Sequence, residues 1–340
     1  SHMKISGWGK YPIVETQQHI FNTEEELRAQ LIIKDKCVAR GFGRSYGDSS
    51  LAPNIFLSTR YNHFLEFDDN SGVLTCEAGV SLAEIIDCLM PQGWFPAVTP
   101  GTKYVSIGGA IASDVHGKNH HHDGCFSEWV KSIKLMLPNG NILICSKRTN
   151  QDLFYATCGG MGLTGIILEA TLQLSPIKSA FINQKTIKAK NLQEIFQLFE
   201  QYESSKYSVA WLDCLATGDQ LGRSLLMVGE HSNNGELIVN PKKYKSVPFD
   251  MPSLILNKFT IKAFNSLYYS RIRGKQKNDT VHLNTFFYPL DNLLNWNKLY
   301  GKKGFIQYQF VIPKKVGFEG MTKILKHISD NKKGSFLSVL

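Results

Sequence analysis

The chain has 340 residues, of which 43% are hydrophobic and 20% are charged. This length and composition are typical of a globular protein with two domains and a sizeable core. No run of about 18 apolar residues occurs, so the sequence predicts no membrane-spanning helix.

The charge and the cysteines narrow the class of protein further. Seven cysteines at scattered spacings indicate neither a disulfide framework nor a zinc site, and they favour a reducing, cytoplasmic compartment. The formal net charge is +9. It indicates either an ordinary solvated basic surface or a surface that attracts an anionic substrate or an anionic lipid. We expect no nucleic-acid partner.

Helices and strands of the first half are expected to alternate irregularly. Two helices begin with capping-box patterns, which pair a hydroxyl residue with a glutamate three positions later, at Thr23 with Glu26 and at Ser81 with Glu84. Strands are expected at Cys37–Ala39, Phe64–Phe67 and Val73–Cys76, and a hairpin joins Val130–Leu137 to Ile142–Cys145. This alternation predicts an α+β fold rather than a doubly wound sheet.

Three glycine-rich segments punctuate the same half. The first, Arg40–Asp48, follows a strand but leads into loop residues, whereas the glycines of a Rossmann site open a helix. Such a turn lets backbone N–H groups surround a phosphate, although most glycine turns are only turns. Ser106–Ala110 and Gly159–Ile167 add small residues where a flat cofactor needs close backbone approach.

The second half is expected to begin at Ser175-Pro176 and to form a sheet with helices on one face. Helices are expected at 191–202 and Phe318–Ile328, and strands at Tyr207–Leu212, Phe305–Ile312 and Lys333–Leu340. The segment His231–Lys262 has weak periodicity and is expected to be a lid or a partly disordered loop. Within it, Lys242–Lys245 and Met251–Leu256 place charge beside apolar residues, which indicates either peripheral contact with the inner membrane face or an ordinary mobile loop.

Taken together, the glycine-rich segments resemble the PCMH-type FAD-binding domain of the vanillyl-alcohol-oxidase class. More narrowly, Gly41–Asp48, Gly108–Ala112 and His116–His121 are similar to the decaprenylphosphoryl-ribose 2-oxidase family. The resemblance runs from Gly7–Gly9 through Gln307–Pro313 and covers essentially the whole chain. It implies a two-subdomain FAD-binding domain over residues 4–175 and an α+β substrate domain over residues 176–340 that is incomplete at its C-terminus.

The resemblance also implies which residues hold FAD. Backbone N–H groups of Arg40–Asp48 would wrap the pyrophosphate, and later segments would approach from the other side. Ile167 is equally interpretable as a core residue. The candidate cofactor-binding residues are Ala39, Arg40, Gly41, Phe42, Gly43, Arg44, Ser45, Tyr46, Gly47, Asp48, Ser49, Gly101, Ser106, Ile107, Gly108, Gly109, Ser113, Asp114, Val115, His116 and Ile167.

Arg44 stands where related sugar-lactone oxidases often carry a histidine that attaches covalently to the flavin. Arginine cannot form that bond, so the FAD is expected to be bound non-covalently.

His116 is the main catalytic candidate, because an imidazole can donate to an oxygen or accept a proton near neutral pH. Tyr46, Gln307 and Gln309 are further candidates. On a strand over Phe305–Ile312 the two glutamines would share one face and suit sugar hydroxyls, unless that face is simply exposed. Trp211 would stack on a sugar or isoprenoid, or fill the core.

No metal site is expected from the run His120–His122. Adjacent histidines do not share a face in regular structure, and no carboxylate or cysteine has a matching spacing.

The implied reaction is oxidation of a secondary sugar hydroxyl, the 2′-OH of a polyprenyl-phosphoryl ribose, to a ketone by hydride transfer to FAD. An epimerase or reductase that acts on the keto product is an expected partner. The alternatives are a sugar-lactone or alditol oxidase, against which Arg44 argues, and a catalytically impaired FAD-binding module. Family members continue past Leu340 with an active-site lysine and tyrosine, so this chain is expected to bind FAD but to turn over poorly.

Overall fold

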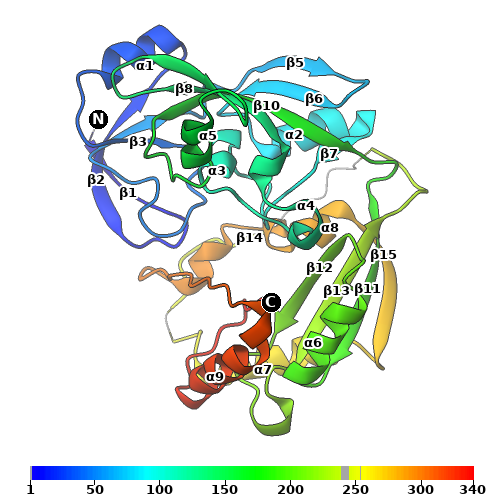
Figure 1. Cartoon of the computed structure of the whole chain (residues 1–340). Helices are drawn as coiled ribbons and strands as arrows, with labels where there is room; N and C mark the ends of the chain where they lie inside the picture. The colour runs from blue at the N-terminus through cyan, green and yellow to red at the C-terminus, as the bar shows by residue number, and fades with distance from the viewer. Residues whose placement is uncertain (1, 239–244, 253) are drawn as a thin grey trace. The chain divides into compact units, whose positions relative to one another are not determined.

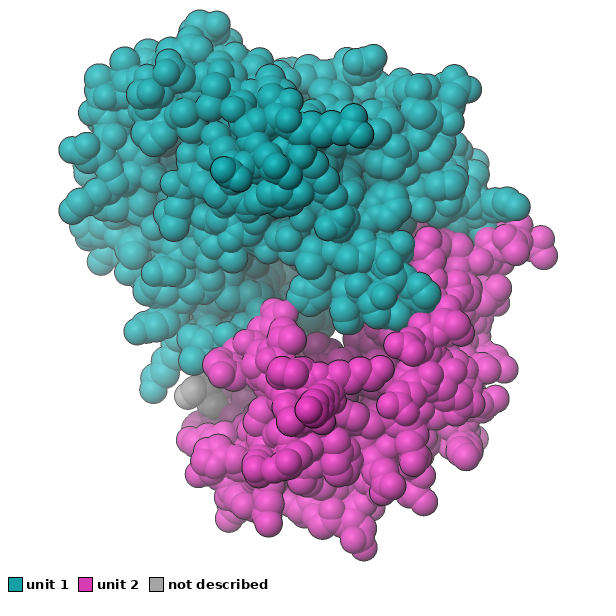
Figure 2. Space-filling model, viewed as in Figure 1, with its two compact units in different colours: residues 1–180, 236–250, 287–307 teal, residues 181–235, 251–286, 308–340 magenta. Residues whose placement is uncertain are grey.

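The computed structural model describes residues 2–238, 245–252 and 254–340. They divide into two compact units, coloured separately in Figure 2. Unit 1 comprises residues 1–180, 236–250 and 287–307, and unit 2 comprises residues 181–235, 251–286 and 308–340. The chain first passes from unit 1 to unit 2 after Ala180, close to the boundary expected at Ser175-Pro176. The units differ from two continuous domains because 236–250 and 287–307 pack with unit 1.

The first sheet of unit 1 has the strand order β1-β2-β4-β3, and Figure 1 labels β1, β2 and β3 of it. Its strands are β1 (His2–Ser6), β2 (Ile13–Ile20), β3 (Cys37–Arg40) and β4 (Asn54–Leu57). Helix α1 (Glu24–Leu31) connects β2 to β3, and its N-cap Thr23 accepts a hydrogen bond from the Glu26 N–H, as predicted. Leu27 and Leu31 face inward and pack with Phe21 and Phe56. Strand β3 of this sheet therefore ends at Arg40, the residue at which the first glycine-rich loop begins.

The second sheet of unit 1 is antiparallel, with the order β5-β6-β10-β8-β9 and β7 added to the end of β10. Its strands are β5 (Phe64–Asp68), β6 (Val73–Glu77), β7 (Trp94–Pro96), β8 (Val130–Met136), β9 (Ile142–Cys145) and β10 (Ile166–Pro176). Its helices are α2 (Leu82–Leu89), α3 (Ile107–Ala112), α4 (His120–Asp123) and α5 (Gln151–Thr157). The predicted hairpin of β8 and β9 and the Ser81 cap of α2 are confirmed. The mixture of sheets and helices confirms the α+β class.

Unit 2 is built on an antiparallel sheet with the order β12-β13-β11-β15 (Figure 1). Its strands are β11 (Phe181–Ala189), β12 (Tyr207–Leu212), β13 (Ser224–His231) and β15 (Gln276–His282). Two predicted helices, α6 (Leu192–Gln201) and α9 (Gly317–Asp330), pack on the face that carries Ala210 and Leu226. Residues Ser338–Leu340 pair with β12, as expected for the last strand.

The expectation of helices on only one face of this sheet is wrong. Helix α7 (Lys258–Ser270) packs on the opposite face, where Tyr268 contacts Trp211 beside Leu225. Consecutive residues of a strand point to opposite faces, so Trp211 and Leu225 leave a second apolar surface to cover. Helix α7 also begins inside the segment expected to be a lid, whose residues 239–244 and 253 lie outside the described residues.

The strand predicted over Phe305–Ile312 does not form among the described residues. The backbone there is irregular, and side chains of both parities, including Ile306 and Val311, are exposed. A strand needs a continuous ladder of backbone hydrogen bonds, and in the described chain this segment has only the bond from the Phe305 N–H to the Gly9 carbonyl at 2.8 Å.

The remaining short elements are the parallel pair β14 (Lys245–Ser246) and β16 (Leu293–Leu294), helix α8 (Leu283–Phe287), and 3₁₀ turns at Met90–Gln92, Phe126–Trp129, Gly218–Gln220, Pro289–Asn292, Trp296–Tyr300 and Lys314–Val316.

Candidate active site

The loop Arg40–Asp48 runs from the end of β3 into irregular structure, not into a helix. Gly43 and Gly47 adopt left-handed conformations with φ of +67° and +68°, which residues other than glycine rarely adopt. The Arg40 guanidinium donates to the Ser6 carbonyl at 2.7 Å and to Ser50 Oγ at 3.1 Å. Arg40 therefore fixes the loop from within.

The backbone N–H groups of this loop are available to a ligand. Within the described part of the chain, no hydrogen bond is donated by the N–H of any residue from 42 to 48, although most of these residues are half-buried. A Cβ added to Gly47 would meet no atom within 4 Å, so the turn borders open space. N–H groups without a partner in the protein can donate to a ligand, and a turn of such donors suits a phosphate. The loop therefore fits the pyrophosphate of FAD.

The second glycine-rich segment lies directly against this loop. A Cβ on Gly41 would fall 2.2 Å from Ser106 Oγ, so only glycine permits this approach. Ser106 caps α3 by accepting from the Gly109 N–H at 3.0 Å, while the N–H groups of Ile107 and Gly108 bond to carbonyls of residues 80 and 78. The N-terminal N–H groups of α3 are thus used within the protein, and the loop at 42–48 carries the unused donors.

The third glycine-rich segment holds the other end of α3. The Gly159 N–H bonds to the Ile111 carbonyl at 3.0 Å, and the Met161 N–H bonds to the Ala112 carbonyl at 2.9 Å. Asp114, at the turn after α3, accepts from the Ser127 N–H at 2.9 Å. Ile167 is buried in the main core of unit 1, which agrees with its interpretation as a core residue.

Two groups after α3 can exchange protons near neutral pH. His116 is exposed on a loop, and its pKa is lowered by burial of part of the ring and by neighbouring His120, against the opposing effect of Asp114. Lys118 directs its Nζ to the Phe287 carbonyl at 3.4 Å, and burial lowers its pKa to about 8. Lys118 lies in the His116–His121 motif, but no spacing in the sequence marks it as a functional residue.

Arg44 and Tyr46 extend from the first loop to other parts of unit 1. The Arg44 guanidinium lies 4.2 Å from the Trp8 ring centre and donates to the Phe42 carbonyl at 2.8 Å. Tyr46 packs edge-on against Phe305, and burial raises its pKa to about 12. Tyr46 is therefore protonated at neutral pH and is a hydrogen-bond donor rather than a base.

A buried carboxylate joins the site without any local sequence signal. Asp291 accepts from the Thr102 hydroxyl at 2.7 Å and from the Lys103 N–H at 2.9 Å. Burial raises its pKa, while these two hydrogen bonds and the charges of Lys103 and Arg44 oppose the shift. Nearby, the Tyr288 and Thr99 hydroxyls bond at 2.6 Å. The partners lie more than 185 residues apart in the sequence, which is why sequence analysis missed them.

The candidate substrate residues Trp211, Gln307 and Gln309 are each described by their own surroundings. Trp211 is only 5% exposed in the core of unit 2, and its indole N–H donates to the Phe336 carbonyl, as expected of core packing. Gln307 and Gln309 are both exposed on the irregular segment described above, and they belong to different units. Their expected common face therefore does not exist in this structure.

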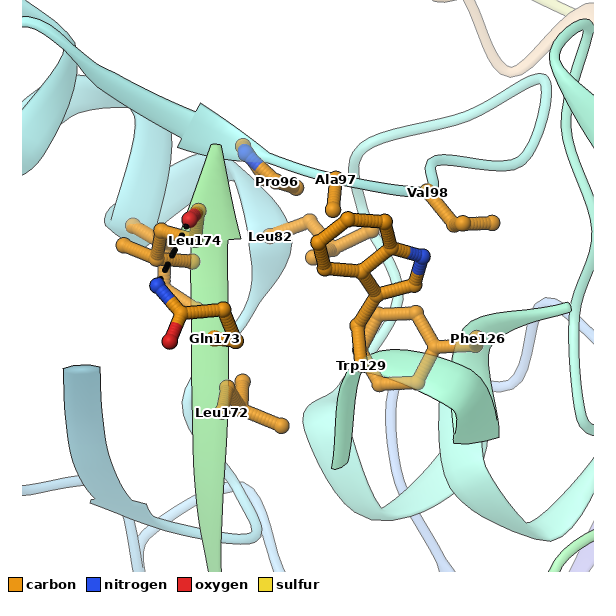
Figure 3. Close-up of a pocket in the computed structure, with 10 residues that line it drawn as sticks. Leu82, Pro96, Ala97, Val98, Phe126, Trp129, Leu172, Gln173 and Leu174 are labelled. Carbon is orange, nitrogen blue, oxygen red and sulfur yellow. Dashed lines mark hydrogen bonds between the residues drawn. The ribbon is translucent and has the colours of Figure 1, made fainter. Parts of the chain in front are cut away.

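Two cavities lie outside the glycine-rich segments. The one in Figure 3, between α2, β7, β10 and the Phe126–Trp129 turn, has apolar walls and a volume of about 10 Å³. That volume holds at most one water molecule. A shallow cavity of about 500 Å³ in unit 2 is lined by polar groups, among them Asn183, Lys185, Glu230 and Thr280. Neither includes a residue of the three glycine-rich segments.

Comparison with known proteins places these features in a family. Residues 22–146 match the family described as FAD binding domain. The chain is 33% identical to decaprenylphosphoryl-beta-D-ribose oxidase of Mycolicibacterium smegmatis over 99% of its own length and 77% of that protein.

Lactone oxidases match over shorter stretches. The putative D-arabinono-1,4-lactone oxidase of Neurospora crassa is 29% identical over 57% of this chain and 34% of that protein. The L-gulonolactone oxidase of Bos taurus is 29% identical over 49% of this chain and 38% of that protein. The match along nearly the whole chain decides between these relatives, and the chain belongs to the decaprenylphosphoryl-β-D-ribose oxidase family of FAD-dependent oxidoreductases.

Proposed function

We propose that this chain oxidises a secondary hydroxyl of a sugar, the 2′-OH of a polyprenyl-phosphoryl ribose, to the ketone. The observation that carries the proposal is the set of unused N–H donors at residues 42–48, in a chain that matches a decaprenylphosphoryl-ribose oxidase over 99% of its length. Bound FAD would supply the acceptor for the hydride. The protein then has to hold the flavin, orient the hydroxyl and accept its proton.

The flavin is proposed to be non-covalent, since Arg44 has no nucleophilic atom to attach it. The N–H groups of 42–48 would hold the pyrophosphate, and Arg44 would add positive charge beside them. His116 is proposed as the group that accepts the hydroxyl proton, because its lowered pKa leaves it neutral at pH 7. Lys118, with a pKa near 8, is proposed to donate to the substrate oxygen.

A visible absorption spectrum tests the cofactor directly. We expect flavin bands in the purified chain, and we expect them to move to the supernatant after acid precipitation. Bands that stay with the pellet would mean a covalent link and would overturn the role given to Arg44. A chain that neither carries flavin nor takes it up from added FAD would contradict the proposed function.

The pH dependence of turnover tests His116. The neutral imidazole accepts the proton, so kcat/KM is expected to fall as the pH drops below the ordinary imidazole pKa of about 6.5. His116→Gln should abolish this acidic limb and lower kcat/KM at pH 8 by about 10²-fold or more. His120→Gln is the matched control. It should keep the limb but move it to higher pH, because His120 contributes to the lowered pKa. An acidic limb that survives in His116→Gln would rule out this role.

A sugar-lactone or alditol oxidase of the same fold is the second candidate, favoured by the two relatives named as lactone oxidases. Turnover of a sugar lactone, with none of a polyprenyl-phosphoryl ribose, would decide for it. If flavin binds but neither substrate is oxidised, the chain acts as an impaired FAD-binding module.

The proposed substrate also suggests the partners and the location. A ketone formed at C2 requires a reductase to complete an epimerisation, so an enzyme of that class is the proposed partner. Among the described residues, no helix is long and apolar enough to cross a membrane. We propose a cytoplasmic protein that touches the inner membrane face, where a polyprenyl chain resides.

A further inference from the structure

Helix α7 leaves a stripe of apolar side chains exposed on its outer face. Phe259 and Leu267 are 73% and 74% exposed, and with Ala263 they form a stripe at i, i+4 and i+8. A helix on a protein surface normally turns such a stripe toward the core. Helices α6 and α9 in the same unit do so, burying Leu192, Ile195, Met321 and Leu325.

The inner face of α7 is held by a buried polar network together with aromatic packing on the sheet. Asn265 is fully buried and donates to Asp213 Oδ1 at 2.8 Å. Arg223 pairs with the same carboxylate at 2.7 Å and donates to Ser266 Oγ at 3.2 Å. Tyr268 adds the contact with Trp211 described above. These bonds fix the orientation of the helix, so the apolar stripe cannot turn inward without breaking a buried network.

Basic residues surround the apolar stripe. Residues 254–275 contain five lysines and arginines and no acidic residue. The basic residues are all exposed, at positions Lys258, Lys262, Arg271, Arg273 and Lys275. Just before the helix, Leu254 is 84% exposed and Ile255 is also exposed. Apolar and aromatic side chains ringed by positive charge are typical of a helix that lies in the interface of an anionic bilayer.

We infer that the outer face of α7, together with Leu254 and Ile255, is the surface by which this protein binds an anionic phospholipid membrane. The choice of a membrane as partner rests on the proposed function, because a polyprenyl substrate is presented at a bilayer. The apolar side chains enter the interface, and the basic residues contact the headgroups. Binding is therefore strengthened by anionic lipid and weakened by salt.

The experiment is co-sedimentation with two kinds of vesicle. One contains phosphatidylcholine alone, and in the other about one lipid in three is the anionic phosphatidylglycerol. We expect binding to the anionic vesicles that falls as salt rises, and at least about tenfold weaker binding by Phe259→Ser/Leu267→Ser and by Lys258→Glu/Lys262→Glu. Ile32→Ser/Ile33→Ser is the matched control, because Ile32 and Ile33 are 55% and 73% exposed in unit 1, and it should bind like the unaltered chain. Equal urea midpoints would establish that all variants are folded.

Three results would overturn the inference. They are an absence of binding to anionic vesicles, equal binding by the α7 variants, and a dimer in sedimentation velocity that the α7 substitutions convert to a monomer. The last would mean that a second copy of the chain covers this face. Flavin absorbance and turnover are measured on the same samples, so a chain that holds flavin but ignores vesicles refutes only the membrane surface. Binding to vesicles without turnover would refute only the proposed function.

Discussion

Replacing Gly79 with alanine is expected to lower the free energy of unfolding by about 3 kcal/mol and to weaken FAD binding with it. Gly79 is buried, and a Cβ there would lie 1.9 Å from the Ser58 carbonyl oxygen and 2.5 Å from that of Tyr61. Both obstacles are backbone atoms, which cannot rotate away as a flexible side chain would. The turn after β4, residues 58–61, and the turn after β6 would have to separate.

Two hydrogen bonds connect the backbone around Gly79 to the candidate site, so a movement at Gly79 would also move residues of the site. The carbonyls on either side of Gly79, those of Ala78 and Val80, accept from the N–H groups of Gly108 and Ile107 at 2.9 and 2.8 Å. A shift at Gly79 therefore displaces the start of α3, whose cap Ser106 lies directly against Gly41 of the first glycine-rich loop. For this reason we expect stability and flavin affinity to fall together.

Urea unfolding and a flavin-fluorescence titration measure the two effects of Gly79→Ala. Gly101→Ala is the control for stability, since a Cβ at Gly101 meets no atom within 4 Å and its φ is not left-handed. The control should unfold at the same urea concentration as the unaltered chain. An unchanged midpoint for Gly79→Ala, or a lower midpoint with unaltered FAD affinity, would contradict the coupling described here.

Local chemistry accounts for the parts of the fold that sequence predicted well. Thr23 and Ser81 satisfy N–H groups of the helices they begin, and the β8–β9 hairpin is marked by its Pro138–Gly140 turn. These signals act over a few residues, so they survive whatever packs around them. The glycine-rich loop is also predicted from local sequence, because its glycines indicate a turn that backbone groups can line without side chains.

Long-range packing explains what sequence did not predict. The segment Phe305–Ile312 has the alternation of a strand, but strand formation depends on a partner and not on pattern alone. Helix α7 exposes an apolar stripe on its outer face, so the period of its apolar residues does not indicate that a buried polar network holds its inner face to the sheet. Asp291 meets Thr102 and Lys103 across nearly the whole flavin-binding unit, and no local spacing encodes that contact.

Asp291→Ala is the second substitution with a large expected effect, about 3 kcal/mol in the free energy of unfolding. The change withdraws both acceptor oxygens from Thr102 and Lys103, and it removes the negative charge near Arg44. The loop Gly101–Tyr104 would then lose its anchor beside the candidate flavin site. A loss of 1.4 kcal/mol in binding corresponds to tenfold, and we expect at least about that rise in the FAD dissociation constant.

Asp291→Asn separates the hydrogen bonds from the charge. Its amide oxygen can accept from the Lys103 N–H, and its amino group can donate to the Thr102 hydroxyl, which can reverse its direction. We therefore expect this variant to lose only about 1 kcal/mol at pH 7. Asp219→Ala, at an exposed aspartate, is the control and should stay within about 0.5 kcal/mol of the unaltered chain.

The pH dependence of these variants tests the raised pKa of Asp291. In the folded protein this carboxyl binds a proton at a pH where the unfolded chain has released it, so its contribution to stability is largest at low pH and is lost as the pH rises through the folded pKa. The advantage of Asp291 over asparagine should therefore shrink as the pH rises from the ordinary carboxyl value of about 3.9 toward 7. Urea midpoints at pH 4, 5, 6 and 7 measure it. An advantage that instead grows with pH would show that the Lys103 and Arg44 charges outweigh burial, and that Asp291 acts as an ion-pair partner rather than as a desolvated anchor.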